Sequence, residues 1–95
     1  MNYLIDLGFE QDTINILNES LPKRALETLE NKKELVTENI KYLKDLGATN
    51  YQTAFIKFYN MFLMDNESFD EIFSKYDSED LVAKLEKNVA IMEYL

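Results

Sequence analysis

Large apolar side chains recur with the period of an α-helix over most of this 95-residue chain. Spacing of this kind places every member on one face of a helix, and that face must be buried against other helices. We expect one such helix to begin near Asn50, because Thr49 and Gln52 have the spacing of a capping box. Its apolar stripe runs without a break through Tyr51, Ala54, Phe55, Phe58, Tyr59, Phe62 and Leu63.

A second helical seam lies between Pro22 and Gly47. Proline suits the first turn of a helix, and glycine is typical of the left-handed residue that ends one. Lys33 lies where the seam requires an apolar side chain, so we expect a bend near residues 31–33. The apolar positions of this seam are Leu26, Leu29, Val36, Ile40 and Leu43.

Shorter helices are predicted on both sides of these two. A helix at residues 2–7 ends at Gly8, and Asp12 caps a brief helix that carries Ile14 and Leu17. Toward the C-terminus, one helix is opened by Ser68 and Glu71, and the next has Ser78 as its N-cap. The apolar stripes of these last two are Phe69, Ile72, Phe73 and Tyr76, then Leu81, Leu85, Val89 and Met92.

The scarcity of turn residues supports an all-helical chain. Two glycines and one proline fall far below the average usage of about 7% and 5%, whereas an all-β domain of this length needs many turns. We predict a single all-α domain over residues 1–95, with five or six helices arranged as stacked helical hairpins in a small, repeat-like domain. Its core should include Leu43, Phe55, Phe62, Phe69, Phe73 and Leu85.

An internal repeat points in the same direction. The segment Tyr3–Gly8 matches Tyr42–Gly47 at five of six positions, 39 residues further along the chain. Residues 88–95 give a fainter third copy of residues 39–46. Periods of 20–50 residues are typical of stacked helical units that bury their apolar faces against one another. The alternative interpretation is that a helix ending in Leu-Gly is simply a common C-cap.

The repeat unit resembles the helical repeat of the mitochondrial transcription termination factor family. The residues that carry the resemblance are Asn39–Gly47, followed by Ile56, Lys57, Phe62 and Leu63, within residues 36–95. The resemblance implies helix pairs stacked into a curved solenoid and nucleic-acid binding along a basic groove. This chain departs from the family where Tyr59 stands near the position of a usual proline, and its second half is acidic. The resemblance therefore bears more on the fold than on the function.

The residue types argue against catalysis and metal binding. The chain has no cysteine and no histidine, so a thiolate site and the commonest general base are both excluded. An EF-hand loop starting at Asp65 would need glycine at its sixth position and glutamate at its twelfth, where Asp70 and Tyr76 stand. No hydroxyl residue lies in a nucleophile or phosphate-binding motif. We expect no enzyme activity, no cofactor and no metal.

Charge and hydropathy indicate the compartment and the kind of partner. The net charge of −8 is divided into −4 over residues 1–20, +2 over 21–57 and −6 over 58–95. An acidic surface repels phosphate, so direct binding to nucleic acid or to an anionic membrane is disfavoured. No apolar run approaches the roughly 20 residues of a membrane span. A signal peptide begins with a positively charged region, whereas no lysine or arginine precedes Lys23 in this chain. We expect a cytoplasmic protein.

Two functional hypotheses follow, and both make another protein the partner. The first is binding through an apolar helix face that includes Ile56, Met61 and Tyr94, with self-association as one form of it. The second is mimicry of DNA, in the manner of phage or mobile-element inhibitors that occupy the basic groove of a nucleic-acid enzyme. The acids that would imitate phosphates are Asp65, Glu67, Asp70, Glu71, Asp77, Glu79 and Asp80. A nucleic-acid-binding helical repeat is the third alternative.

Overall fold

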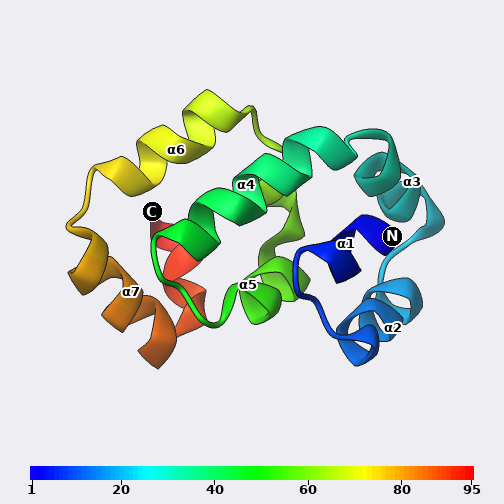
Figure 1. Cartoon of the computed structure of the whole chain (residues 1–95), viewed down its shortest axis with the longest axis horizontal. Helices are drawn as coiled ribbons and strands as arrows, with labels where there is room; N and C mark the ends of the chain where they lie inside the picture. Colours follow the sequence, from blue (N-terminus) through cyan, green and yellow to red (C-terminus); the bar gives the residue numbers. More distant parts are fainter.

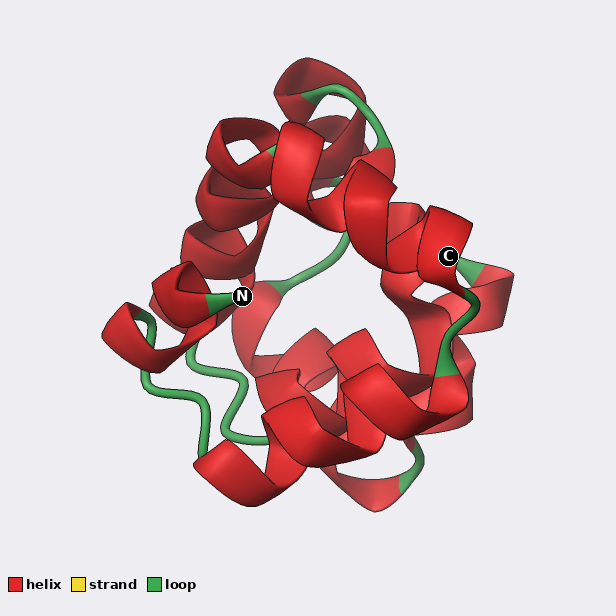
Figure 2. Ribbon diagram, turned by 90° about the vertical axis from the view of Figure 1, so that its right-hand side faces the viewer, coloured by secondary structure: helices red, strands yellow, loops and turns green.

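The computed structural model describes residues 1–95 and contains helices but no strand (Figures 1 and 2). The all-α prediction is confirmed, but the predicted number of five or six helices is wrong. The chain forms seven α-helices and two 3-10 helices: α1 (Asn2–Asp6), α2 (Gln11–Ser20), α3 (Lys23–Asn31), α4 (Lys33–Asp45), α5 (Tyr51–Phe58), η1 (Tyr59–Leu63), α6 (Asn66–Ser74), α7 (Ser78–Lys87) and η2 (Val89–Tyr94).

The additional elements arise where two predicted helices end early. Phe58 has φ −133°, so α5 stops there and the chain tightens into η1. Asn88 has φ −153° and its side chain caps η2, so the stripe from Leu81 to Met92 is shared between two elements. Asparagine and aromatic residues are only moderate helix formers, and tertiary contacts decide the conformation at both sites. The predicted bend at residues 31–33 is confirmed, since α3 and α4 meet at Lys32.

Helix α4 lies at the centre of the molecule and packs against α1, α3, α5, η1 and α6 (Figure 1). Its inward seam of Val36, Ile40 and Leu43 is at most 1% exposed. Helix α2 packs on α5, while η2 packs against both α5 and α7. The arrangement of these helices as stacked repeats stays a prediction.

A row of aromatic rings runs through the core beside α4. The rings of Tyr51, Phe9, Phe55, Phe62, Phe69 and Phe73 follow one another with centroids between 4.7 and 5.5 Å apart. Edge-to-face and tilted contacts of this kind add to the free energy of burial. All six predicted core residues are at most 1% exposed: Leu43, Phe55, Phe62, Phe69, Phe73 and Leu85.

Four predicted helix caps are wrong in detail: other side chains cap α6 and α7, whereas α2 and α5 have no side-chain cap. The N-cap of α6 is Asp65, whose carboxylate accepts from the N–H of Ser68, and the N-cap of α7 is Asp77. A carboxylate is stabilised at a helix N-terminus by the helix dipole. Asp12 lies inside α2, whose N-cap is Glu10. Thr49 and Gln52 form no capping box: the Thr49 side chain bonds to Glu86, and that of Gln52 bonds to Glu10 and to Thr13 at the start of α2.

The repeated segments end in the same local geometry. Gly8 has φ +98° and Gly47 has φ +103°. In each case the amide two residues after the last leucine bonds back five residues, from Phe9 to the Leu4 carbonyl and from Ala48 to the Leu43 carbonyl. This is the Schellman arrangement of a helix C-terminus. The two copies therefore share their C-cap, as the sequence predicts.

The surroundings of the two glycines differ. The end of α1 is held by Lys44, whose ammonium donates to the Leu7 carbonyl and lies 5.0 Å from the centroid of the Tyr51 ring. The Tyr51 hydroxyl donates to the Gly8 carbonyl at 3.3 Å. A Cβ on Gly8 would come within 2.7 Å of that hydroxyl, whereas a Cβ on Gly47 would meet nothing within 4 Å.

We expect Gly47→Ala to cost about 1–2 kcal/mol, because alanine resists a positive φ. Gly8→Ala should cost about 0.5–1.5 kcal/mol more, because it also displaces the Tyr51 hydroxyl from its hydrogen bond. Urea unfolding followed by circular dichroism measures both. Equal costs would mean that the contact between Tyr51 and Gly8 adds no stability.

Candidate partner-binding surfaces

The three apolar residues expected to contact a partner lie on different elements. Ile56 on α5 and Met61 on η1 are half-buried and rest against the core. Tyr94, on η2, is 82% exposed and does not pack on the core. Helix α5 contacts both η1 and η2, so the structure brings the three elements together while only Tyr94 stands clear in solvent.

The chain from α5 into η1 carries more exposed apolar surface than the sequence predicts. Phe58 and Tyr59 were expected inside the core stripe, but both are half-buried. The break at Phe58 turns η1 relative to α5, so that one stripe no longer faces the core along its whole length. We call the half-buried large side chains of this segment the α5–η1 surface: Ile56, Phe58, Tyr59, Met61 and Leu63.

Part of this surface forms the wall of a groove against α3. The groove has a volume of about 570 Å³ and is the largest hollow of the molecule. Sequence reasoning could not find it, because α3 and η1 are separated by the whole of α4 and α5. We call it the α3–η1 groove; its lining residues are Pro22, Arg24, Ala25, Thr28, Tyr59, Asn60 and Leu63.

The seven acids of residues 65–80 have different structural roles. Asp65 and Asp77 cap helices, and Asp80 pairs with Lys84 at 3.1 Å. The backbone N–H of Ser68, helped by its side chain, holds the pKa of the Asp65 carboxyl below its usual range. The three acids that are exposed and form neither an ion pair nor a cap are Glu67, Glu71 and Glu79.

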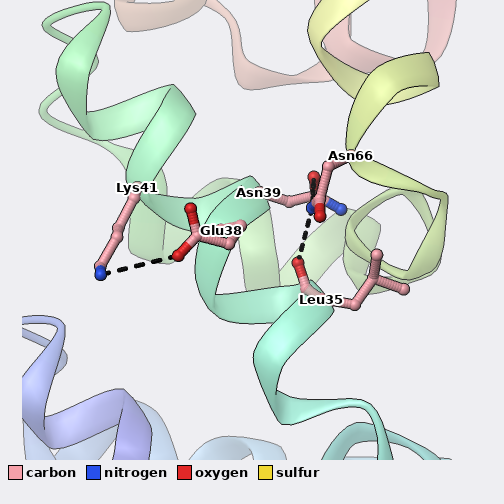
Figure 3. Close-up of polar contacts among 5 residues, drawn as sticks. All are labelled: Leu35, Glu38, Asn39, Lys41 and Asn66. Atoms are coloured by element: carbon pink, nitrogen blue, oxygen red, sulfur yellow. Dashed lines mark hydrogen bonds and ion pairs between the residues drawn. The ribbon is translucent and has the colours of Figure 1, made fainter.

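Asp70 is the only one of the seven acids that lines an acidic depression of about 220 Å³ between α4 and α6. Partial desolvation, followed by the charge of Glu38, raises the pKa of its carboxyl above the usual range. Glu38 is paired with Lys41 at 3.7 Å (Figure 3). The depression is lined by Glu38, Lys41, Tyr42, Asp45, Asn66 and Asp70.

The fully buried side chain of Asn39 fixes η1 and α6 on α4. Its amide nitrogen donates to the carbonyls of Phe62 and Met64 at 2.9 and 2.8 Å. Its amide oxygen accepts from Asn66 at 2.8 Å, and Asn66 also donates to the Leu35 carbonyl at 3.1 Å (Figure 3). Every buried side-chain polar atom in this network therefore has a partner. Helical periodicity does not predict a polar residue in this part of the core.

Comparison of the chain with protein-family models, with curated proteins and with solved structures finds no match. The resemblance to the termination-factor repeat therefore stays a prediction. No group of three or more acids is placed to hold a metal ion together. None of the helices has both the length and the apolar composition needed to cross a membrane.

The raised pKa of Asp70 predicts a gain in stability for Asp70→Asn at neutral pH, of up to about 0.5 kcal/mol, the scale of partly exposed charge interactions. An acid with a raised folded-state pKa costs stability once pH exceeds that pKa and costs nothing below its unfolded value near about 4. The gain should thus appear as pH rises from about 4 and level off above the folded-state pKa.

Denaturant titrations of Asp70→Asn across this pH range measure the effect, with Glu71→Gln on the solvent side of α6 as the matched control. The depression also holds Glu38, Lys41 and Asp45, so Glu38→Gln should reduce the gain from Asp70→Asn. A gain that is the same at all pH values would contradict the electrostatic cause.

We expect Asn39→Ala to destabilise the domain by about 2–3 kcal/mol, since it leaves the buried Phe62 carbonyl, the partly buried Met64 carbonyl and the Asn66 amide short of partners. Asn15→Ala, on the exposed face of α2, should change stability by under about 0.5 kcal/mol. Unfolding midpoints in urea give both values. If the two variants unfold alike, Asn39 does not hold η1 and α6 in place.

Proposed function

We propose that this chain is a non-enzymatic protein-binding domain that acts through the α5–η1 surface. The observation that carries the proposal is the density of half-buried large side chains there: five of the eight residues from Ile56 to Leu63. No other segment of this length leaves as many large apolar groups incompletely covered. Aromatic residues and methionine are also enriched where protein interfaces exclude water.

The charge of the domain supports a protein as the partner. A net charge of −8 repels nucleic acid and anionic lipid over about a Debye length, so neither approaches the apolar surface easily. A protein with a neutral or basic surface has no such barrier. A second copy of this chain is also acidic. It can be the partner only if the interface is apolar enough to overcome the repulsion between the two molecules.

A second candidate function is that of an acidic inhibitor which occupies a basic groove on a nucleic-acid enzyme. The observation that favours it is the exposure of Glu67, Glu71 and Glu79 without an ion pair. Glu67 and Glu71 lie one turn apart on α6. In this case the acids would supply most of the contacts and the α5–η1 surface would contribute little. Direct nucleic-acid binding through a helical repeat remains the third and least supported alternative.

Photo-crosslinking can identify the partner. A benzophenone side chain introduced at position 94, where Tyr94 is 82% exposed, should capture a protein in cells. The same group at Asn18, on the exposed side of α2, is the matched control and should not capture it. If position 94 captures no protein that the purified domain then binds, or if Asn18 captures the same protein equally well, the proposal fails.

Binding kinetics then distinguish the two candidate functions. Truncating Ile56, Met61 or Tyr94 to alanine should raise the dissociation rate about tenfold, as loss of a buried anchor does. The triple reversal Glu67→Lys, Glu71→Lys and Glu79→Lys should mainly lower the association rate. Surface plasmon resonance measures both rates, with circular dichroism to check folding. Abolished binding in the triple reversal, together with a steep salt dependence, would instead favour the acidic inhibitor.

A further inference from the structure

The α3–η1 groove has a different charge from every other hollow on the molecule. The other four hollows are each lined by at least one glutamate or aspartate, with lysine beside it. The α3–η1 groove is lined by no acid and by one cation, Arg24. In a chain with 18 acids and 10 bases, this is the one hollow from which carboxylates are excluded.

Arg24 is the only arginine of the chain and has no partner within it. None of the 18 acidic side chains pairs with its guanidinium. The neighbouring acid on the helix, Glu27, lines a different hollow together with Lys23. A guanidinium presents a planar fork of donors that matches a carboxylate in two parallel hydrogen bonds. Arg24 is thus free to make such a pair with another molecule.

The remaining polar groups of the groove are suited to the same ligand. The Tyr59 hydroxyl and the Asn60 amide line it and form no hydrogen bond within the chain. Thr28 is already occupied, because its hydroxyl donates to the Arg24 carbonyl at 2.9 Å. The lining therefore combines unpaired polar side chains with the apolar residues Pro22, Ala25 and Leu63. An occupant needs an apolar body and a carboxylate acceptor.

We infer that the α3–η1 groove binds a helical segment of a partner protein, whose apolar side chains fill the groove and whose carboxylate pairs with Arg24. A volume of about 570 Å³ lies within the usual range for binding pockets and admits a few side chains. A helix laid into a groove presents such anchors one turn apart. The inference rests on the proposed function, because Tyr59 and Leu63 belong to the α5–η1 surface.

The test uses the whole chain and a synthetic probe. The probe is a capped helical peptide of about 15 residues, long enough to form a helix, with leucines along one face and glutamates beside them. A second peptide has glutamines in place of the glutamates. Two-dimensional NMR of the ¹⁵N-labelled domain should show shifts at the amides of Ala25, Thr28 and Leu63, and stronger binding of the glutamate peptide.

Arg24→Gln should weaken binding of the glutamate peptide about tenfold, the scale of a charge-assisted hydrogen bond. It should leave the glutamine peptide unaffected. Arg24→Lys should restore only part of the loss, because an ammonium cannot form the two parallel bonds. Lys23→Gln is the matched control: it removes the same charge one residue away, from a side chain outside the groove, and should change affinity less than about twofold.

Several results would overturn the inference. The first two are equal binding of both peptides and chemical-shift changes confined to other faces of the domain. The third is an Arg24→Gln effect no larger than that of Lys23→Gln. The last is self-association in analytical ultracentrifugation, with a second copy of the chain covering the groove. Arg24 is exposed, so its variants should fold, and circular dichroism checks this. If the peptides fail while position 94 still captures a partner, the groove assignment falls and the proposed function stands.

Discussion

The side-chain amide of Asn39 donates to the carbonyls of Phe62 and Met64 at the end of η1, where regular helical bonding stops. These bonds lie in the core, where an unpaired carbonyl would be costly. They fix the position of η1 along α4, and the bonds of Asn66 to Asn39 and Leu35 fix the start of α6. The rings of Phe62 and Phe69 then meet at 5.3 Å. The aromatic row depends on this polar contact for its register.

Fixing η1 in this way also determines what the surface presents. Phe62 points into the core, and Asn39 on α4 holds its carbonyl and that of Met64. In the tighter 3-10 turn, its neighbours then lie to either side of the core: Tyr59 and Leu63 border α3, while Met61 stays half-buried. An α-helix continued through residue 63 would have kept the whole stripe on one face. The break at Phe58 thus lies within the α5–η1 surface and directly before Tyr59, Asn60 and Leu63, which line the groove.

Local sequence rules predict the parts of this structure that depend on local physics. Helical periodicity identifies Phe55, Phe62, Phe69 and Phe73 as core residues, though not Phe9, and the two glycines identify helix ends with positive φ. Long-range contacts defeat the same rules. Gln52 has the spacing of a capping residue, yet its side-chain oxygen accepts from Glu10 and Thr13 across 39 and more residues. The groove is equally beyond local reasoning, since its walls come from α3 and η1, which lie far apart in the sequence and both pack on α4.

Under the proposed function, the two kinds of charge on the molecule would select a partner at different distances. The net charge of −8 acts over about a Debye length and favours approach by a protein that is basic overall. The unpaired Arg24 acts only on contact and favours a carboxylate beside apolar side chains. Many proteins are basic overall, and many carry a carboxylate beside apolar side chains. Few basic proteins also present an isolated acidic, amphipathic helix. Selection by both would let a small domain discriminate between partners without a large interface, because the wrong partner either approaches slowly or leaves Arg24 unpaired.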